Sequence, residues 1–142
     1  MPHPLFVLVV GAAAALLTAL LTARMSLAGS RQFYTAFMAA TAFIYVGSAL
    51  ACGETSPLVL ESAIAVVLFN VALVGQRRSM KFTAAAFLLH GLWDLLHALK
   101  GLGASAGPTF PLLCVAYDWV IAGFVWNLGG TTTETTGLAA GS

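Results

Sequence analysis

Residues 82–99 read FTAAAFLLHGLWDLLHAL, and this segment decides the fold because three ionisable side chains interrupt an otherwise apolar run. Its length is close to the roughly 20 residues that an α-helix needs to cross a bilayer. On a helix that turns about 100° per residue, His90, Asp94 and His97 fall on one face, within about 60° of one another. Side chains three or four positions apart can meet, so Asp94 can pair with either histidine. The segment therefore predicts a membrane-spanning helix with one polar face.

Four further apolar segments surround this one, at about 5–23, 33–51, 57–75 and 110–128. Hydrophobic residues make up 60% of the 142-residue chain and charged residues only 8%, whereas a soluble domain carries about 25% charged residues. A chain with so little charge cannot cover a water-facing surface. We therefore expect an all-α fold, a polytopic membrane helix bundle in which residues 1–128 form one domain of five transmembrane helices. The Gly/Thr-rich segment 129–142 is expected to be a disordered cytoplasmic tail.

The basic residues predict the orientation of this bundle. With five antiparallel spans, the connections after the first and third spans lie on the same side as the C-terminus. The chain has six Lys and Arg residues. Five of them lie on this side, namely Arg24, Arg31, Arg77, Arg78 and Lys81, and only Lys100 lies on the opposite side. The positive-inside rule then places the C-terminus in the cytoplasm and the N-terminus outside. The net charge of +1 and the absence of a basic patch argue against a nucleic-acid partner.

Three of the five acidic residues lie inside predicted spans, namely Glu61, Asp94 and Asp118. An ionisable group in hydrocarbon normally faces the protein interior, finds a partner and marks a functional site. The alternating direction of the spans puts all three carboxylates in the outer half of the bilayer, together with His97. Cys114 shares this half and lies one helical turn before Asp118. We therefore expect a polar site between the bilayer centre and the outer face, although convergence in one protomer depends on how the helices are rotated.

Charge balance limits what such a site can be. Several ionised carboxylates in a medium of low dielectric constant repel one another, so the site needs shared protons, imidazolium ions or a bound cation. The candidate metal ligands are His90, Asp94, His97, Asp118 and Glu61. Imidazole and carboxylate groups suit a divalent metal such as zinc, iron or manganese. Glu61, Asp94 and Asp118 are also candidate catalytic acids or bases. The simpler alternative is that buried His–Asp hydrogen bonds only hold helices together, at about 0.6 kcal/mol each.

The same residues carry a resemblance to a known family. The block His90-Gly91-Leu92-Trp93-Asp94-Leu95-Leu96-His97, followed one span later by Cys114 and Asp118, resembles small bacterial integral-membrane proteins grouped as domain of unknown function 6010. The resemblance covers about residues 28–126 and includes Arg31-Gln32-Phe33, Ile44-Tyr45-Val46-Gly47 and Leu60-Glu61. Family members often carry a further histidine where this chain has Ala98. The resemblance implies a multi-pass protein of the bacterial inner (plasma) membrane and brings no established activity.

Three functions remain open from the sequence. The first is a metal-binding protein or acid/base enzyme of the membrane that acts on a lipid-soluble small molecule. The second is a component of proton or cation transport, since chains of Asp, Glu and His relay protons across membranes. The third is a non-catalytic subunit whose polar face docks against a partner membrane protein or a second copy in a homo-oligomer. We favour the first, because the inner half of the bundle offers few polar groups for a complete transport path.

Overall fold

The computed structural model describes residues 2–53, 55–100, 107 and 109–139, with side chains described up to residue 129. The elements in this part of the chain are all α-helices: α1 (Pro4–Thr22), α2 (Leu27–Ala42), α3 (Ile44–Cys52), α4 (Thr55–Arg77), α5 (Met80–Lys100) and α6 (Thr109–Ala139). They provide five stretches long and apolar enough to cross a membrane, namely Pro4–Thr22, Leu27–Cys52, Thr55–Arg77, Met80–Lys100 and Thr109–Gly129. The predicted five-span helical architecture is therefore confirmed, whereas insertion into a membrane and its direction stay predictions.

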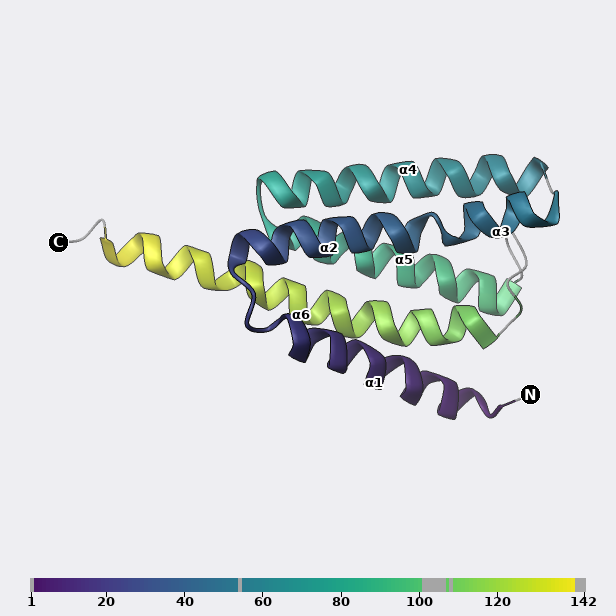
Figure 1. Ribbon diagram of the computed structural model, residues 1–142, viewed down its shortest axis with the longest axis horizontal. Coiled ribbons are helices and arrows are strands. Elements are labelled where there is room, and N and C mark those ends of the chain that lie inside the picture. Colours follow the sequence, from purple (N-terminus) through teal and green to yellow (C-terminus); the bar gives the residue numbers. More distant parts are fainter. Residues whose placement is uncertain (1, 54, 101–106, 108, 140–142) are drawn as a thin grey trace.

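The helices lie side by side and alternate in direction, so the two termini lie at opposite ends of the bundle (Figure 1). Helix α5 occupies the centre, because it packs against α4 on one side and α6 on the other. Helices α2 and α3 pack mainly on α4, and α1 lies at the edge against α6. This order places α5, with its ionisable side chains, between α4 and α6.

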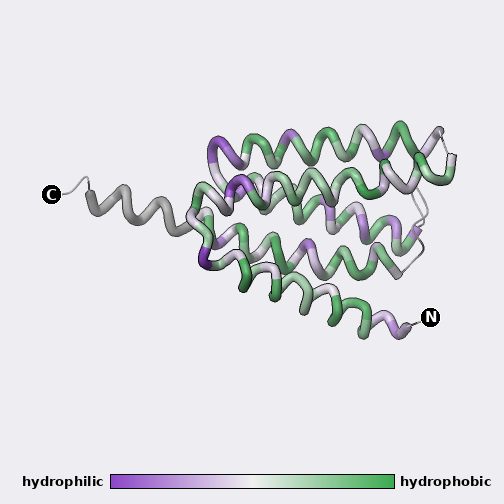
Figure 2. The backbone as a smooth tube through the Cα atoms, viewed as in Figure 1, coloured by the Kyte–Doolittle hydropathy of each residue, from purple (hydrophilic) through white to green (hydrophobic). Residues whose placement is uncertain are grey.

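The alternating topology gathers five of the six Lys and Arg residues at one end of the bundle, and Lys100 lies at the other end. The connections from α1 to α2 and from α4 to α5 both lie at the end toward which α6 runs (Figure 1). Figure 2 shows hydrophilic residues at that end and mainly hydrophobic ones along the helices. The backbone of α6 continues as helix to Ala139, into the segment 129–142. The disorder predicted for that segment from its composition stays a prediction.

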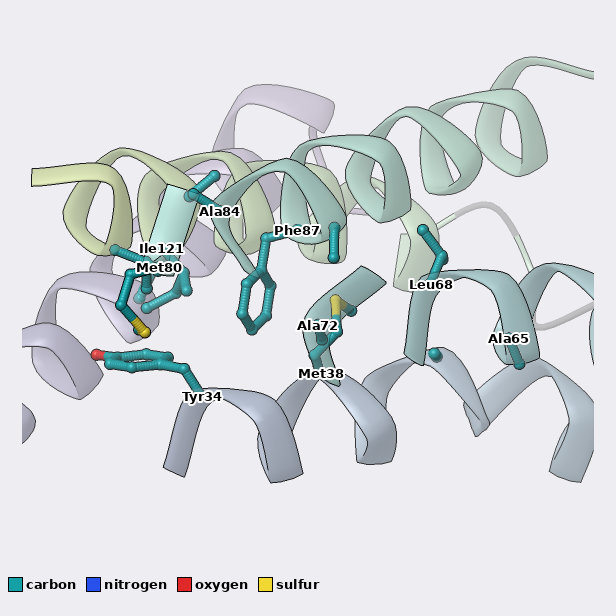
Figure 3. Close-up of a cluster of buried hydrophobic side chains, with 14 residues drawn as sticks. Tyr34, Met38, Ala65, Leu68, Ala72, Met80, Ala84, Phe87 and Ile121 are labelled. Carbon is teal, nitrogen blue, oxygen red and sulfur yellow. The ribbon is translucent and has the colours of Figure 1, made fainter. Parts of the chain in front are cut away.

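The core consists of a few large side chains set among alanines (Figure 3). The large members are Tyr34, Met38, Leu68, Met80, Phe87, Ile121 and Val125. Small residues fill most of the remaining buried positions, including Ala15, Ala42, Ala65, Ala72, Ala84, Ala86 and Ala122. Small residues at helix contacts let backbones approach closely, which is how helices associate in a bilayer that provides no hydrophobic driving force.

The second span is broken, where the sequence predicts one continuous helix over about 33–51. Helix α2 begins earlier, at Leu27, because the Ser26 hydroxyl accepts a hydrogen bond from the Gly29 backbone N–H and caps the helix. The break comes at Phe43, whose φ of −87° and ψ of 0° are not helical. Two residues earlier, the Thr41 hydroxyl bonds to backbone carbonyls of its own helix, a contact that often bends helices. Helix α3 then carries Tyr45 into the interior.

Candidate functional site

Three ionisable side chains meet between α5 and α6. The Nδ1 atom of His90 lies 2.5 Å from Oδ2 of Asp118 and 3.3 Å from Oδ2 of Asp94. The three residues are 3%, 1% and 0% exposed, respectively. The potential ligand atoms of this group, which we call the His90 triad, all lie within 4.8 Å of one another. The convergence expected from the sequence therefore occurs for these three residues within one chain.

The packing of α5 on α6 explains this convergence. His90 and Asp94 are one turn apart on α5 and share the face that meets α6. Gly91 lies between them at the contact, and a Cβ atom there would come within 2.6 Å of the Trp119 indole and 3.3 Å of the Asp118 Cβ. The missing side chain thus lets α6 approach closely enough for Asp118 to reach His90.

The hydrogen bonds of the triad are incomplete. The Tyr45 hydroxyl donates to Oδ1 of Asp94 at 2.7 Å. Within the described part of the chain, His90 Nε2 and Asp94 Oδ2 are buried and have no hydrogen-bond partner. Buried polar atoms are nearly always satisfied in proteins, so two unsatisfied atoms in one small cluster need an explanation. Both atoms carry lone pairs that a metal ion or a ligand can use.

Glu61 and His97, the other two predicted ligands, form a neighbouring pair between α4 and α5. His97 Nε2 lies 2.9 Å from Glu61 Oε1, and the Trp93 indole N–H donates to Glu61 Oε2 at 3.0 Å. His97 Nδ1 lies 3.0 Å from the Trp93 carbonyl, which can only accept, so this nitrogen carries a proton. Nε2 must then either donate as part of an imidazolium ion or accept from a protonated Glu61. In both cases one proton lies between the two side chains.

Tyr45 connects the triad with this second pair, and the sequence did not identify it as a site residue. Its ring stacks on the His97 imidazole, with centroids 4.1 Å apart and planes 12° apart, while its hydroxyl bonds to Asp94. The sequence offered one indication of this role, because Tyr45 lies in the second predicted span at about the depth of Asp94. The sequence alone could not show that it faces the interior. The structure thus brings all five predicted residues into one region, divided into a triad and a pair, and their metal and catalytic roles stay predictions.

A cavity of about 170 Å³ opens beside the triad. His90, Asp94 and Asp118 lie at its floor, together with the free thiol of Cys114. Its walls come from aromatic and aliphatic side chains, chiefly Phe37, Ile44, Phe110, Leu113 and Tyr117. The ionisable cluster is therefore not sealed in the core but borders a space that a small molecule can occupy.

A comparison with known families matches residues 6–132 to a family of unknown function (DUF6010). The chain belongs to this family. The match contains every residue of the triad, the pair and the cavity, and it extends the resemblance seen in the sequence to include α1. No curated protein and no solved structure matches the chain. Membership in DUF6010 therefore supports the architecture without assigning a reaction.

The donor set of this DUF6010 site fits a divalent metal ion. One imidazole nitrogen and two carboxylates are ligands that zinc, iron and manganese all accept. Ligand bonds of about 2 Å allow donor atoms on opposite sides of an ion to be about 4 Å apart, and the donor atoms of the triad all lie within 4.8 Å of one another. Three protein ligands would leave a further coordination position, and the adjoining cavity could supply water or a ligand to fill it.

Proposed function

We propose that the protein is a multi-pass protein of the bacterial inner membrane that binds a divalent metal ion at His90, Asp94 and Asp118. The bound metal and its neighbouring acid/base groups would act on a lipid-soluble molecule in the adjoining cavity. The observation that carries the proposal is the pair of buried atoms without hydrogen-bond partners, His90 Nε2 and Asp94 Oδ2, beside a third donor on Asp118. The outer-half location and the cytoplasmic C-terminus rest on the distribution of basic residues.

The charges of the triad support a cation. Two carboxylates face a single imidazole, so even an imidazolium ion leaves one excess negative charge unless a proton is shared. The described ion pairs of this cluster involve histidine alone as the basic partner. A divalent ion would neutralise the carboxylates and use the unsatisfied atoms together.

The acid/base roles divide between the two clusters. Asp94 and Asp118 border the cavity and are placed to exchange protons with a bound molecule. Glu61 is not among the described residues that line the cavity, and it forms hydrogen bonds with Trp93 and with His97, on which the Tyr45 ring stacks. We therefore assign substrate chemistry to the two aspartates and assign the Glu61–His97 pair to holding a proton and orienting Tyr45.

Transport fits the structure less well. A transport path needs polar groups through both halves of the bundle. Toward the basic end, the described residues next to the triad belong to the apolar core, with Met38, Phe87 and Ile121 fully buried. The buried hydroxyls of Thr35 and Thr83 are both bonded to the Ala72 carbonyl. The arrangement therefore favours a site reached from one side over a path across the membrane.

Metal analysis of the purified protein tests the proposal. Protein extracted in mild detergent from cells supplied with zinc, iron and manganese should hold one divalent ion per chain, and His90→Gln and Asp118→Asn should hold none. Thr83→Val is the matched control, because it removes a buried polar contact outside the triad and should keep the metal. If the wild-type protein binds none of the three metals, before or after reconstitution with metal, the proposed ligand role of the triad is wrong.

A further inference from the structure

The cavity lies in a window between the second span, formed by α2 and α3, and α6, which do not pack closely on each other. Helices α2 and α3 rest on α4 and α5, while α6 rests on α5 and α1, so α5 forms the floor between them. Two aromatic pairs span the gap, Phe37 with Tyr117 at 5.7 Å and Tyr45 with Phe110 at 6.5 Å between ring centroids. The cavity occupies the space between these pairs.

The mouth of this window lies within the stretches that span the membrane. Ile44 is 41% exposed and Phe110 is 36% exposed, and both line the cavity. Ile44 belongs to the span Leu27–Cys52 and Phe110 to the span Thr109–Gly129. Ile44 lies eight residues, or about 12 Å along a helix, from the end of its span. Because Phe110 is the second residue of its span, the opening runs from the end of the spans to this depth, and its deeper part would face hydrocarbon in a bilayer.

The walls present almost no free polar group to an occupant. The Thr41 hydroxyl bonds to the carbonyls of Phe37 and Met38. The Tyr117 hydroxyl pairs with Thr18 of α1 at 2.8 Å, and the Tyr45 hydroxyl is bonded to Asp94. Every hydroxyl of the lining thus already has a partner. What remains is carbon on the walls, and the Cys114 thiol and the triad at the floor.

The volume sets the size of the occupant. An engineered apolar cavity of about 150 Å³ in another protein binds benzene, and the present cavity has about 170 Å³. It therefore accommodates a ring or a group of similar size, whereas a whole lipid is far too large.

We propose that the ligand of this site is an apolar molecule dissolved in the bilayer, which inserts a ring-sized group sideways between α3 and α6, past Ile44 and Phe110, to reach the triad. This inference rests on the proposed function only for the chemistry that the triad would perform on the ligand. The lateral entry rests on the window itself.

Cys114 reports on this route, because its thiol lies in the cavity. In a Cys52→Ser background, the protein in lipid nanodiscs is treated with phenylmercuric acetate, an apolar ring-sized thiol reagent. A parallel sample receives its charged counterpart, p-mercuribenzenesulfonate. Intact-mass spectrometry counts the groups attached over time. We expect phenylmercury to label Cys114 at least about tenfold faster than the sulfonate, which corresponds to about 1.4 kcal/mol of barrier.

A variant at the mouth makes the route specific. Ile44→Trp should slow phenylmercury labelling at least about tenfold. Leu16→Trp, on the exposed face of α1, should leave the rate unchanged. Equal rates for the two reagents would show access from water and overturn the inference. So would an unaffected Ile44→Trp variant, or a thiol that reacts only after unfolding in detergent.

The metal content of the same samples separates the two proposals. Lateral labelling in a protein that binds no metal would overturn the metal site alone. A metal-binding protein without lateral labelling would overturn the entry route alone.

Discussion

Asp118→Asn separates a metal site from a structural hydrogen bond more sharply than any other single change. The substitution keeps the size of the side chain and one acceptor oxygen, but removes one of the two carboxylates that face His90 Nδ1. A hydrogen bond with an ionised partner contributes about 1.5–3 kcal/mol, whereas the average intramembrane hydrogen bond contributes about 0.6 kcal/mol. Loss of the carboxylate also relieves its repulsion with Asp94. In the metal-free protein these effects oppose each other, and the free energy of unfolding should change by about 1 kcal/mol or less.

The metal-bound protein should respond differently. A metal at one hundred times its dissociation constant stabilises the folded state by about 2.7 kcal/mol. If the loss of one ligand weakens binding about a hundredfold, the same metal concentration stabilises the variant by only about 0.4 kcal/mol. The metal-dependent gain should therefore fall by about 2.3 kcal/mol in Asp118→Asn.

Unfolding in mixed micelles, followed by circular dichroism with and without metal, measures both quantities. Thr83→Val provides the control, because its buried hydroxyl lies outside the triad and its metal-dependent gain should equal that of the wild type. The reasoning is refuted if Asp118→Asn gains as much from metal as the wild type does. It is also refuted if the wild type gains nothing and the variant is destabilised in the absence of metal, as a purely structural contact requires.

Three further variants test the arrangement around the triad. Tyr45→Phe keeps the ring on His97 but removes the hydrogen-bond donor to Asp94, so metal affinity in a chelator competition should fall about tenfold. An unchanged affinity would contradict the role of Tyr45 in orienting Asp94. Glu61→Gln changes the pair but not the triad, so elemental analysis should show the wild-type metal content, and loss of metal would place Glu61 among the ligands. Gly91→Ala should lower the free energy of unfolding by about 1–3 kcal/mol because of overpacking against α6. Gly123→Ala, whose added Cβ meets no atom within 4 Å, should not lower it.

The lengths of the apolar segments were enough to predict the five-span helical architecture. A hydrocarbon environment requires every backbone group to bond within its own segment, so long apolar runs become helices with little ambiguity. The helical ends differ from the predicted ones by a few residues, as at Leu27, where a serine cap starts α2 early. The break at Phe43 was not predicted, because no glycine or proline stands at or next to this position in the sequence.

The partners of the ionisable residues could not be read from the sequence, since they depend on how each helix is rotated. Spacing along α5 made Asp94 an equal partner for His90 and His97. In the structure α5 presents two adjacent faces, so His90 and Asp94 meet α6, while Trp93 and His97 meet α4. The predicted depth of each residue along its span was therefore enough to place the five residues in one region. How the helices pack then divides them into two clusters.

The close packing of α5 and α6 makes a purely structural role for the triad a poor explanation. These two helices have the most extensive contact in the bundle, which includes Gly91 against Trp119, and both contribute fully buried apolar side chains such as Phe87 and Ile121 to the core. Such an interface does not need a buried ionic cluster, because apolar side chains of similar volume often serve as well as a buried ion pair or better. A structural contact would also satisfy its own polar atoms, whereas among the described residues His90 Nε2 has no hydrogen-bond partner, and Asp94 Oδ2 forms no hydrogen bond although it lies 3.3 Å from His90 Nδ1. The cost of burying these groups beside a cavity supports the proposal that they bind something that the chain itself does not provide.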